Sequence, residues 1–246
     1  MSLNAIAFIN NRKKVVVLTN DRIAHIISYV IECYNLLLVD KPSFSKSFVA
    51  QHTTFHFEDY LKMEFVDNYL IKQKHILATK LSSLEQVTFN YETIQRFTDT
   101  SDGKEKSDKI DVYVNKIGLK DEWAVDEEHL YLAIECKRIS TLSDCQDYIG
   151  DIEKFSTRDY SKLRIPFESQ IAFIESSKLD HISVSNNINK RLQSTPTVLT
   201  KQLLTSIAFN SPFKGSYFSI HKKTFKKKEP FKIFHLLFDY SQLITN

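Results

Sequence analysis

Glycine and proline are scarce in this chain, with four glycines and five prolines among 246 residues. The sequence contains neither a G-x-x-x-x-G-K-[S/T] loop nor a G-x-G-x-x-G turn. Both motifs use glycine because the backbone must approach a phosphate group closely. The common phosphate-loop and dinucleotide-binding classes are therefore excluded.

Cysteine is also scarce, and Cys33, Cys136 and Cys145 lie far apart without a C-x-x-C or Cys/His ligand spacing. This pattern argues against a disulfide scaffold or a structural zinc site and favours a reducing compartment. No signal peptide is recognisable at the start, and polar residues interrupt the longest apolar stretch, Ile23–Val39. We expect a cytoplasmic protein.

The composition, 42% hydrophobic and 26% charged, is typical of a folded globular protein. The chain is long enough to bury a substantial core, and no repeat or Pro/Gly/Ser-rich linker divides it. We expect one domain over residues 1–246. Within it, the patterns predict an N-terminal helical extension (1–50), a core (55–178), and a C-terminal helix with a basic hairpin (179–246).

The net charge of +3 is unevenly distributed, because residues 214–232 hold seven lysines and one glutamate, a local charge of +6. Such a basic segment is expected where a protein meets the backbone of a nucleic acid. A solvated hairpin tip explains the same lysines equally simply. The candidate phosphate contacts in this segment are Lys222, Lys223, Lys226, Lys227 and Lys228.

Hydrophobic periodicity predicts helices first, then mostly strands. The chain should therefore form a mixed α/β fold with a central β-sheet flanked by helices. The expected helices are Ile23–Leu38, Phe57–Lys74, Ser143–Lys154 and part of Asn187–Phe209. The expected strands are Gln86–Phe97, Lys109–Ile117, His129–Ile139, Gln170–Glu175, Tyr217–Phe225 and Phe231–Asp239.

Charged residues interrupt two of the apolar strands. Glu135 and Lys137 are two positions apart and so share one face of a strand, whereas Cys136 should face the core. Two charges in an apolar strand are costly unless something compensates them. Asp111 on the preceding strand offers a second carboxylate, and carboxylate oxygens bind Mg²⁺. The alternative is a charged strand at a sheet edge.

Asp111, Glu135 and Lys137 resemble the D…ExK signature of the PD-(D/E)xK nuclease superfamily, which has the restriction-endonuclease-like fold. The similarity extends to the order of elements: an acidic helix, a strand, the Asp strand, the ExK strand, a helix and a short strand. It covers residues 57–175, about half of the chain. The proline that names the motif is replaced here by Ile110.

The resemblance implies roles for these residues. Asp111 and Glu135 would hold Mg²⁺ or Mn²⁺ together with the backbone carbonyl of Cys136, and Lys137 would orient or deprotonate water or stabilise phosphate charge. Many members of the family add an acid from the first helix, for which Glu58 is our choice. Two alternatives remain: Glu64 could take the place of Glu58, and Asp108 that of Asp111. Arg138, which follows Lys137, could contact the phosphate backbone.

The expected function is a metal-dependent nuclease that hydrolyses phosphodiester bonds, with DNA as the favoured substrate, in restriction, phage defence or repair. Two alternatives stay open. One is a catalytically silent nuclease-fold module that binds nucleic acid or a protein, and the other is an RNA-cutting toxin or effector. Because one chain carries one catalytic centre, cleavage of both strands would need a homodimer, a partner subunit or two binding events.

Overall fold

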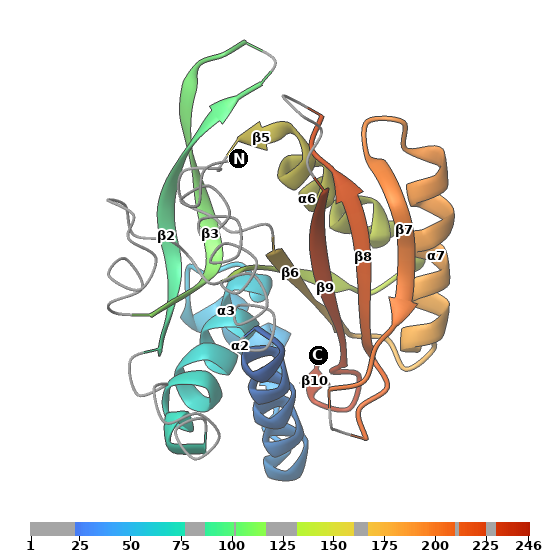
Figure 1. The fold of residues 1–246 in the computed structure, drawn as a ribbon. Helices are drawn as coiled ribbons and strands as arrows, with labels where there is room; N and C mark the ends of the chain where they lie inside the picture. The colour runs from blue at the N-terminus through green and yellow to red at the C-terminus, as the bar shows by residue number, and fades with distance from the viewer. Residues whose placement is uncertain are drawn as a thin grey trace, which may run out of the picture.

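An eight-stranded mixed sheet organises the chain in the computed structural model (Figure 1). The structure describes residues 23–76, 87–100, 102–116, 132–159, 167–209, 212–224 and 230–246. The helices after the N-terminal one (Ile23–Asp40) are α2 (Lys46–His52), α3 (Phe57–Phe65), the π-helix η1 (Val66–Ile71), the 3₁₀-helix η3 (Leu142–Asp144), α6 (Cys145–Thr157) and α7 (His181–Ser194). The strands are β1 (Phe44–Ser45), β2 (Val87–Asp99), β3 (Glu105–Lys116), β4 (Leu132–Ile139), β5 (Arg158–Asp159), β6 (Phe167–Ile174), β7 (Leu199–Ser206), β8 (Ser216–Lys222), β9 (Pro230–Asp239) and β10 (Ile244–Thr245).

The strand order in the large sheet is β5-β2-β3-β4-β6-β9-β8-β7. Strands β2, β3 and β4 are antiparallel neighbours, β4, β6 and β9 are parallel, and β8 and β7 return antiparallel at the far edge. The parallel pair β4–β6 is connected through α6, as parallel strands require a crossover. The expected mixed α/β fold around a central sheet is thus confirmed.

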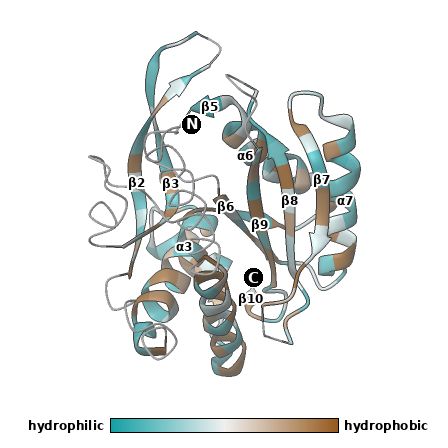
Figure 2. Cartoon of the chain, in the orientation of Figure 1, coloured by the Kyte–Doolittle hydropathy of each residue, from teal (hydrophilic) through white to brown (hydrophobic). Residues whose placement is uncertain are grey.

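Two hydrophobic cores lie on the two faces of the sheet, because successive side chains of a strand point to opposite faces. Ile134 and Cys136 of β4 belong to the larger core, with the N-terminal helix and α3. Ile139 of the same strand belongs to the second core, beneath α6 and α7. In Figure 2, β9 is hydrophobic along most of its length, whereas the outer part of the β2–β3 hairpin is largely hydrophilic.

The N-terminal helix is fixed to the sheet by its tyrosines. The hydroxyl of Tyr34 donates to the carbonyl of Asp239 (3.0 Å) and accepts from its N–H (2.8 Å), while the ring stacks on Phe238 at 4.0 Å. The hydroxyl of Tyr29 donates to the carbonyl of Leu70 at 2.8 Å. By length and composition this helix could cross a membrane, and half of its residues are buried inside the protein.

The predicted long helix starting at Phe57 is present but changes its geometry. It begins as α3, with Glu58 and Asp59 in its first turn, where carboxylates suit the helix dipole. After Phe65 it widens into the π-helix η1, which ends at Ile71. Such π segments are rare, and they are frequent at functional sites.

The strands β2 and β3 form a hairpin. Its tip turns at Gly103, whose φ of +70° lies in the left-handed region that glycine adopts without steric cost. Both strands extend further toward the tip than the sequence suggested. Closer to the start of β2, Glu92 has a φ of +59°, an unusual value for a residue with a side chain, and the pairing with β3 skips this residue but keeps the same register from Tyr91 to Thr93.

The prediction of a partial helix within residues 187–209 is confirmed up to Ser194, whereas the strand that follows it was not predicted. The helix α7 starts at His181, six residues earlier than expected, because the side chain of Asp180 caps it by accepting from the N–H of Ser183 (2.7 Å). It ends at Ser194, shortly before Pro196, and the chain then forms the edge strand β7. Proline cannot continue a helix, and the β-branched residues Thr195, Thr197 and Thr200 fit an extended backbone better.

A chain of buried hydrogen bonds crosses the C-terminal part of the sheet. It links the hydroxyl of Tyr148 to His235 (2.9 Å), His235 to Ser219 (2.7 Å), Ser219 to His221 (2.7 Å), and His221 to Thr200 (3.1 Å). Each ring and each hydroxyl can donate once and accept once in this chain only if both histidines are neutral. Burial lowers the pKa of His221 to about 4 and that of His235 well below its ordinary value.

We therefore expect the protein to lose stability in acid. The unfolded chain binds a proton at each histidine near pH 6.5, whereas the folded chain resists it until about pH 4 at His221. Stability should be constant above pH 6.5 and should fall as the pH drops below it, by about 3 kcal/mol for His221 alone. Urea unfolding between pH 4.5 and 7.5 measures this slope. His221→Gln should make it shallower and exposed His52→Gln should not; an equal slope in all three proteins would contradict the prediction.

Candidate active site

The ladder between β3 and β4 stops early, and this leaves one edge of β4 open. The last paired residues are Val112 and Ile134, although β4 continues to Ile139 alongside β6. Beyond that point the N–H groups of Cys136 and Arg138 lie on the side from which β3 has departed. Backbone donors that are removed from water need a partner. The side chains that accept hydrogen bonds from these two N–H groups form the candidate site.

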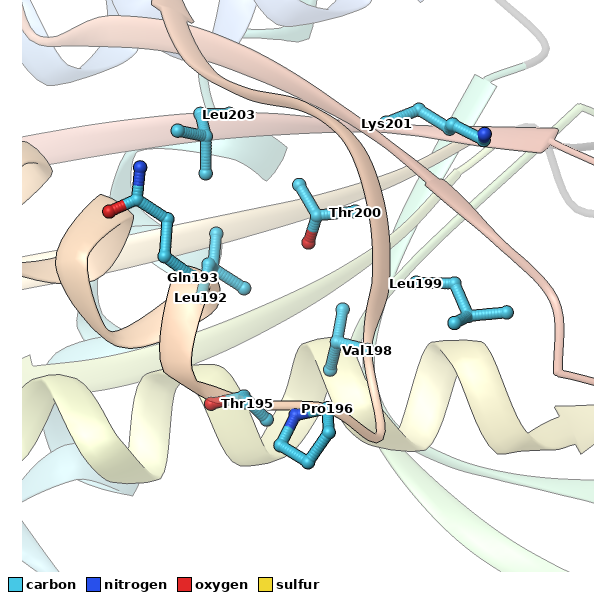
Figure 3. Close-up of a pocket in the computed structure, with 9 residues that line it drawn as sticks. All are labelled: Leu192, Gln193, Thr195, Pro196, Val198, Leu199, Thr200, Lys201 and Leu203. Carbon is cyan, nitrogen blue, oxygen red and sulfur yellow. The ribbon is translucent and has the colours of Figure 1, made fainter.

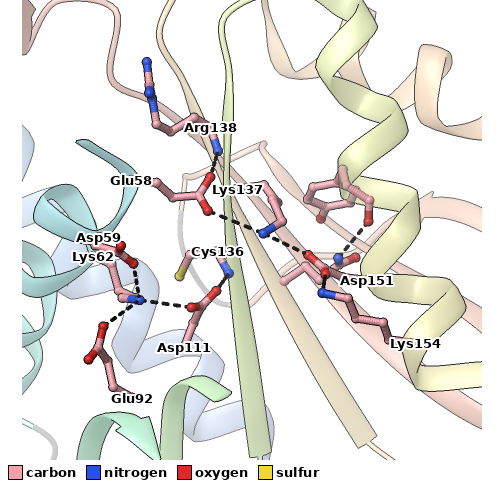
Figure 4. A network of polar contacts seen from close by, with 12 residues as sticks. Glu58, Asp59, Lys62, Glu92, Asp111, Cys136, Lys137, Arg138, Asp151 and Lys154 are labelled. Atoms are coloured by element: carbon pink, nitrogen blue, oxygen red, sulfur yellow. Dashed lines mark hydrogen bonds and ion pairs between the residues drawn. The ribbon is translucent and has the colours of Figure 1, made fainter. Parts of the chain in front are cut away.

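Two carboxylates replace the missing strand (Figure 4). Asp111 Oδ2 accepts from the N–H of Cys136 at 2.8 Å, and Glu58 Oε2 accepts from the N–H of Arg138 at 2.9 Å. One carboxylate comes from β3 just past its last pair, and the other from the first turn of α3. The two acidic residues predicted from separate parts of the sequence thus lie along the same edge of β4.

The second oxygen of each carboxylate faces an ammonium group. Asp111 Oδ1 lies 3.0 Å from Lys62 Nζ, and Glu58 Oε1 lies 3.4 Å from Lys137 Nζ. Glu58 and Asp111 are 30% and 18% exposed and Lys137 is 23% exposed. These three side chains therefore remain partly exposed to solvent.

Lys62 occupies the acidic end of this network. Its side chain is 2% exposed, and its Nζ lies 2.8 Å from Asp59 Oδ1 and 3.8 Å from Glu92 Oε1, in addition to Asp111. Burial alone would lower the pKa of Lys62, but the charge of Asp111 and hydrogen bonds to Asp59 and Asp111 raise it above its ordinary value. Glu92 reaches this cluster from its left-handed position on β2. Backbone strain of this kind is typical of functional sites.

Lys137 lies between the two helices that flank the sheet. Its Nζ is 3.4 Å from both Glu58 Oε1 of α3 and Asp151 Oδ2 of α6. Burial opposes the charge of Lys137, but Asp151 first, then Glu58, Asp111 and Glu135, raise its pKa above the ordinary value. Asp151 is 2% exposed; its Oδ1 accepts from Lys154 at 2.6 Å, whereas Oδ2 has the ion pair with Lys137 but no well-directed hydrogen bond.

Glu135 lies on the face of β4 that carries Lys137, as the alternation predicted, and it is only 8% exposed. It pairs in register with Gln170 of the parallel strand β6. Gln170 donates to the carbonyl of Tyr148 at 3.0 Å, and its own Oε1 has no hydrogen-bond partner among the described residues. A buried carboxylate therefore lies on the same face of β4 as the lysine, and the residue paired with it on β6 carries a buried acceptor oxygen.

Cys136 faces the larger core, as predicted, and is 1% exposed. Burial and the neighbouring Asp111 raise the pKa of its thiol well above the ordinary value, so the thiol is not a nucleophile. Its backbone is a different matter. In a strand the N–H and carbonyl of one residue point to the same side, so the carbonyl of Cys136 faces the edge that Asp111 and Glu58 occupy.

The donor groups fit a hard divalent cation in their chemistry. Carboxylate oxygens and a main-chain carbonyl are the ligands that Mg²⁺ and Mn²⁺ accept. The same place already stabilises a buried positive charge, the ammonium of Lys62. As the side chains stand, however, the carboxylates face lysines, and within the described part of the chain no three His, Cys, Asp or Glu side chains are arranged to hold a metal ion. A metal at Asp111 would have to exchange with Lys62.

The remaining predicted residues are placed as follows. Arg138 is held by the buried carboxylate of Glu175 and lies over the ring of Phe57 at 5.0 Å, so its guanidinium is already engaged. Lys223 donates to the carbonyl of Phe155 at 2.6 Å, at the end of α6. Lys222 ends β8 and is half-buried. Lys226, Lys227 and Lys228 lie outside the described residues.

The structure also separates the alternatives for the acidic positions. Glu64 accepts from Asn68 one turn along the helix, at 2.7 Å, whereas Glu58 reaches Lys137. Asp108 pairs with Arg158, whereas Asp111 accepts from the N–H of Cys136. Glu58 and Asp111 therefore lie along the open edge of β4, whereas Glu64 and Asp108 make contacts elsewhere.

Asp59, Glu92, Lys62 and Asp151 are members of the network that the sequence analysis did not identify, and the last two are buried. Lys62 follows Glu58 by four residues and so shares its helix face, a spacing that could have indicated it. Asp151 precedes Lys154 by three residues, which is typical of an ordinary surface pair until the tertiary structure buries the aspartate. A lysine or aspartate seldom lies in a core, so the neighbouring sequence does not predict that these two side chains are buried.

A shallow pocket between α7 and β7 lies apart from this network (Figure 3). None of its lining residues is acidic, and Thr200 connects its floor to the buried chain of histidines. It is lined by Leu192, Gln193, Thr195, Pro196, Val198, Leu199, Thr200, Lys201 and Leu203.

We expect Asp111→Leu to destabilise the metal-free protein by about 3–5 kcal/mol, because it leaves the Cys136 N–H unpaired and removes a partner of buried Lys62. Asp111→Asn should cost less, since the amide oxygen can still accept from Cys136. Urea unfolding in EDTA measures both. The control is Glu105→Gln, which breaks an exposed pair with Arg96 and should change little. An Asp111→Leu variant as stable as this control would contradict the assigned role.

Comparison with known proteins identifies no relative of this chain. No family model, curated protein or solved structure matches the chain. The resemblance to PD-(D/E)xK nucleases therefore depends on the residues and on the arrangement described above.

Proposed function

We propose that the chain is a metal-dependent nuclease of the PD-(D/E)xK type, with its centre at Asp111, Glu135 and Lys137. The observation that carries the proposal is the meeting of Glu58, Asp111 and Lys137 at the open edge of β4. These residues come from three elements that are far apart in the sequence. The alternative, a charged strand at the edge of a sheet, does not describe β4, because β4 lies inside the sheet between β3 and β6.

The order of elements supports the same proposal. The helix α3 is followed by the antiparallel strands β2, β3 and β4, then by α6, and then by β6 parallel to β4. This is the order that the resemblance to the restriction-endonuclease-like fold implies. The Asp strand and the ExK strand are direct neighbours in it, paired up to Val112 and Ile134.

The residues divide the chemistry among them. Asp111, Glu135, Glu58 and the carbonyl of Cys136 would hold Mg²⁺ or Mn²⁺, which when bound offsets phosphate charge and lowers the pKa of water. Lys137, held as an ammonium between Glu58 and Asp151, would donate to a non-bridging oxygen of the scissile phosphate. The N–H groups of Cys136 and Arg138 keep the two carboxylates oriented before any ligand arrives.

DNA is the proposed substrate, because the basic C-terminal segment fits a polyanion and the chain carries no RNA-binding signature. An RNA-cutting effector would use the same catalytic groups, and cleavage of RNA in place of DNA in a substrate test would identify it. A silent nuclease-fold module needs no metal. Metal binding and cleavage therefore separate the three functions.

The proposal predicts different effects for two residues of the centre. Purified protein is incubated with supercoiled plasmid, linear duplex, single-stranded DNA and RNA, each with Mg²⁺, Mn²⁺ or EDTA. Glu135→Ala should weaken both metal binding and cleavage, because a ligand is removed. Lys137→Ala should leave metal affinity nearly intact, while cleavage falls by about two orders of magnitude or more. Calorimetric metal titrations accompany the cleavage assays.

Lys154→Ala is the matched control for Lys137→Ala. Lys154 pairs with the same carboxylate, Asp151, but is 42% exposed and contacts the other oxygen. Cleavage should change little in this variant. No cleavage of any substrate by the wild type, or equal metal affinity in the wild type and Glu135→Ala, would contradict the nuclease proposal.

The basic segment generates a separate prediction about binding. If Lys226, Lys227 and Lys228 contact phosphates, changing all three to glutamine should weaken binding similarly for unrelated duplex sequences. The slope of log K against log salt should fall by roughly 0.9 for each phosphate that the protein no longer neutralises. Lys223 is left unchanged because it holds the end of α6.

The control for this experiment removes the same charge elsewhere. Lys178, Lys190 and Lys201 are exposed, and their triple glutamine variant should keep the wild-type salt slope. Fluorescence anisotropy with two unrelated duplexes measures all three proteins. Identical slopes in both triple variants would favour the solvated tip that the sequence left as the alternative.

A further inference from the structure

Lys62 is a buried cation of the candidate site that the proposed chemistry does not use. Its Nζ lies within 3.0 Å of carboxylate oxygens of both Asp59 and Asp111, with Glu92 at 3.8 Å. Only 2% of its side chain is exposed. A lysine this deeply buried is stable only because carboxylates surround it.

The carboxylates need a positive charge just as strongly. Asp59, Glu92 and Asp111 converge on one ammonium, and without a cation between them they would repel one another. A divalent cation bound at Asp111 would supply this charge, but it would also repel the ammonium. Lys62 and the metal therefore cannot both lie at Asp111 Oδ1.

We infer that Lys62 is an internal counter-ion that competes with the divalent cation for Asp111: it holds the acidic cluster together in the metal-free protein and is displaced when metal binds. The inference deepens the proposed function and rests on it. It assigns to Lys62 a role in setting metal affinity, outside the group of residues that contact the substrate.

The geometry permits this exchange with little rearrangement. Asp111 keeps its orientation, because Oδ2 accepts from the N–H of Cys136 while only Oδ1 faces Lys62. Lys62 keeps Asp59 and Glu92 as partners after it leaves Asp111. Both of these carboxylates are about one-third exposed, so the flexible lysine side chain can withdraw toward solvent without losing its charge partners.

The test is a calorimetric titration of MnCl₂ and of MgCl₂ into the substrate-free protein. Lys62→Gln should bind each metal at least tenfold more tightly than the wild type, because the competing charge is gone. Lys62→Arg keeps the charge and should stay close to the wild type. The matched control is Lys109→Gln, which pairs with Glu92 at 2.8 Å but does not contact Asp111; its affinity should change less than about twofold.

Thermal unfolding gives a second readout that needs no activity. In EDTA, Lys62→Gln should unfold at a lower temperature than the wild type, and MnCl₂ should raise its unfolding temperature by more. If Lys62→Gln does not fold in EDTA, refolding by MnCl₂, and not by the same ionic strength of KCl, supports the inference. Failure of MnCl₂ to restore folding overturns it.

The outcomes separate this inference from the nuclease proposal. Metal affinity in Lys62→Gln that is equal to or weaker than in the wild type overturns the inference, even if the wild type cleaves DNA with Mg²⁺. Absence of metal binding in both proteins overturns it as well. Tighter binding in Lys62→Gln supports it, even if no phosphodiester substrate is ever cleaved, in which case the nuclease proposal alone fails.

Discussion

The early end of the β3–β4 ladder is the constraint on which the candidate site depends. Past Val112 and Ile134, two N–H groups of a central strand lose their strand partner, and Asp111 and Glu58 satisfy them. Each carboxylate then has one oxygen left, which attracts a lysine. The charged network is thus a consequence of backbone hydrogen bonding, since an unpaired buried N–H costs about as much as a missing hydrogen bond.

The two faces of β4 give the site its mixed character. Cys136 and its neighbours on one face anchor the strand in the larger core, while Glu135 and Lys137 project toward α6. Leu132, Ile134 and Cys136 are packed in this core, which suits a site whose groups must be held in position. The π-helix η1 that follows α3 packs on the larger core as well, and the carbonyl of its Leu70 accepts a hydrogen bond from the hydroxyl of Tyr29.

The sequence predicted the strand positions of Asp111, Glu135 and Cys136 because alternation along a strand is a local property that tertiary structure rarely changes. It failed at residues 199–206, where leucines among polar residues fit a helix or a strand and only pairing with β8 decides. It also missed Lys62 and Asp151. Their burial depends on β3 and β4, which lie far from them in the sequence, so no periodicity within α3 or α6 reveals it.

Stability alone does not explain why this edge is capped by charges. A neutral amide or hydroxyl could accept from Cys136 and Arg138 without requiring two lysines, and burying Lys62 and Asp151 carries a desolvation cost that apolar residues would avoid. Clusters of partly buried charges with shifted pKa values are typical of functional sites for this reason. These buried charges lie beside Asp111, Glu58 and Lys137, which remain partly exposed. Such an arrangement of opposite charges supports the proposal of an anionic substrate together with a divalent cation.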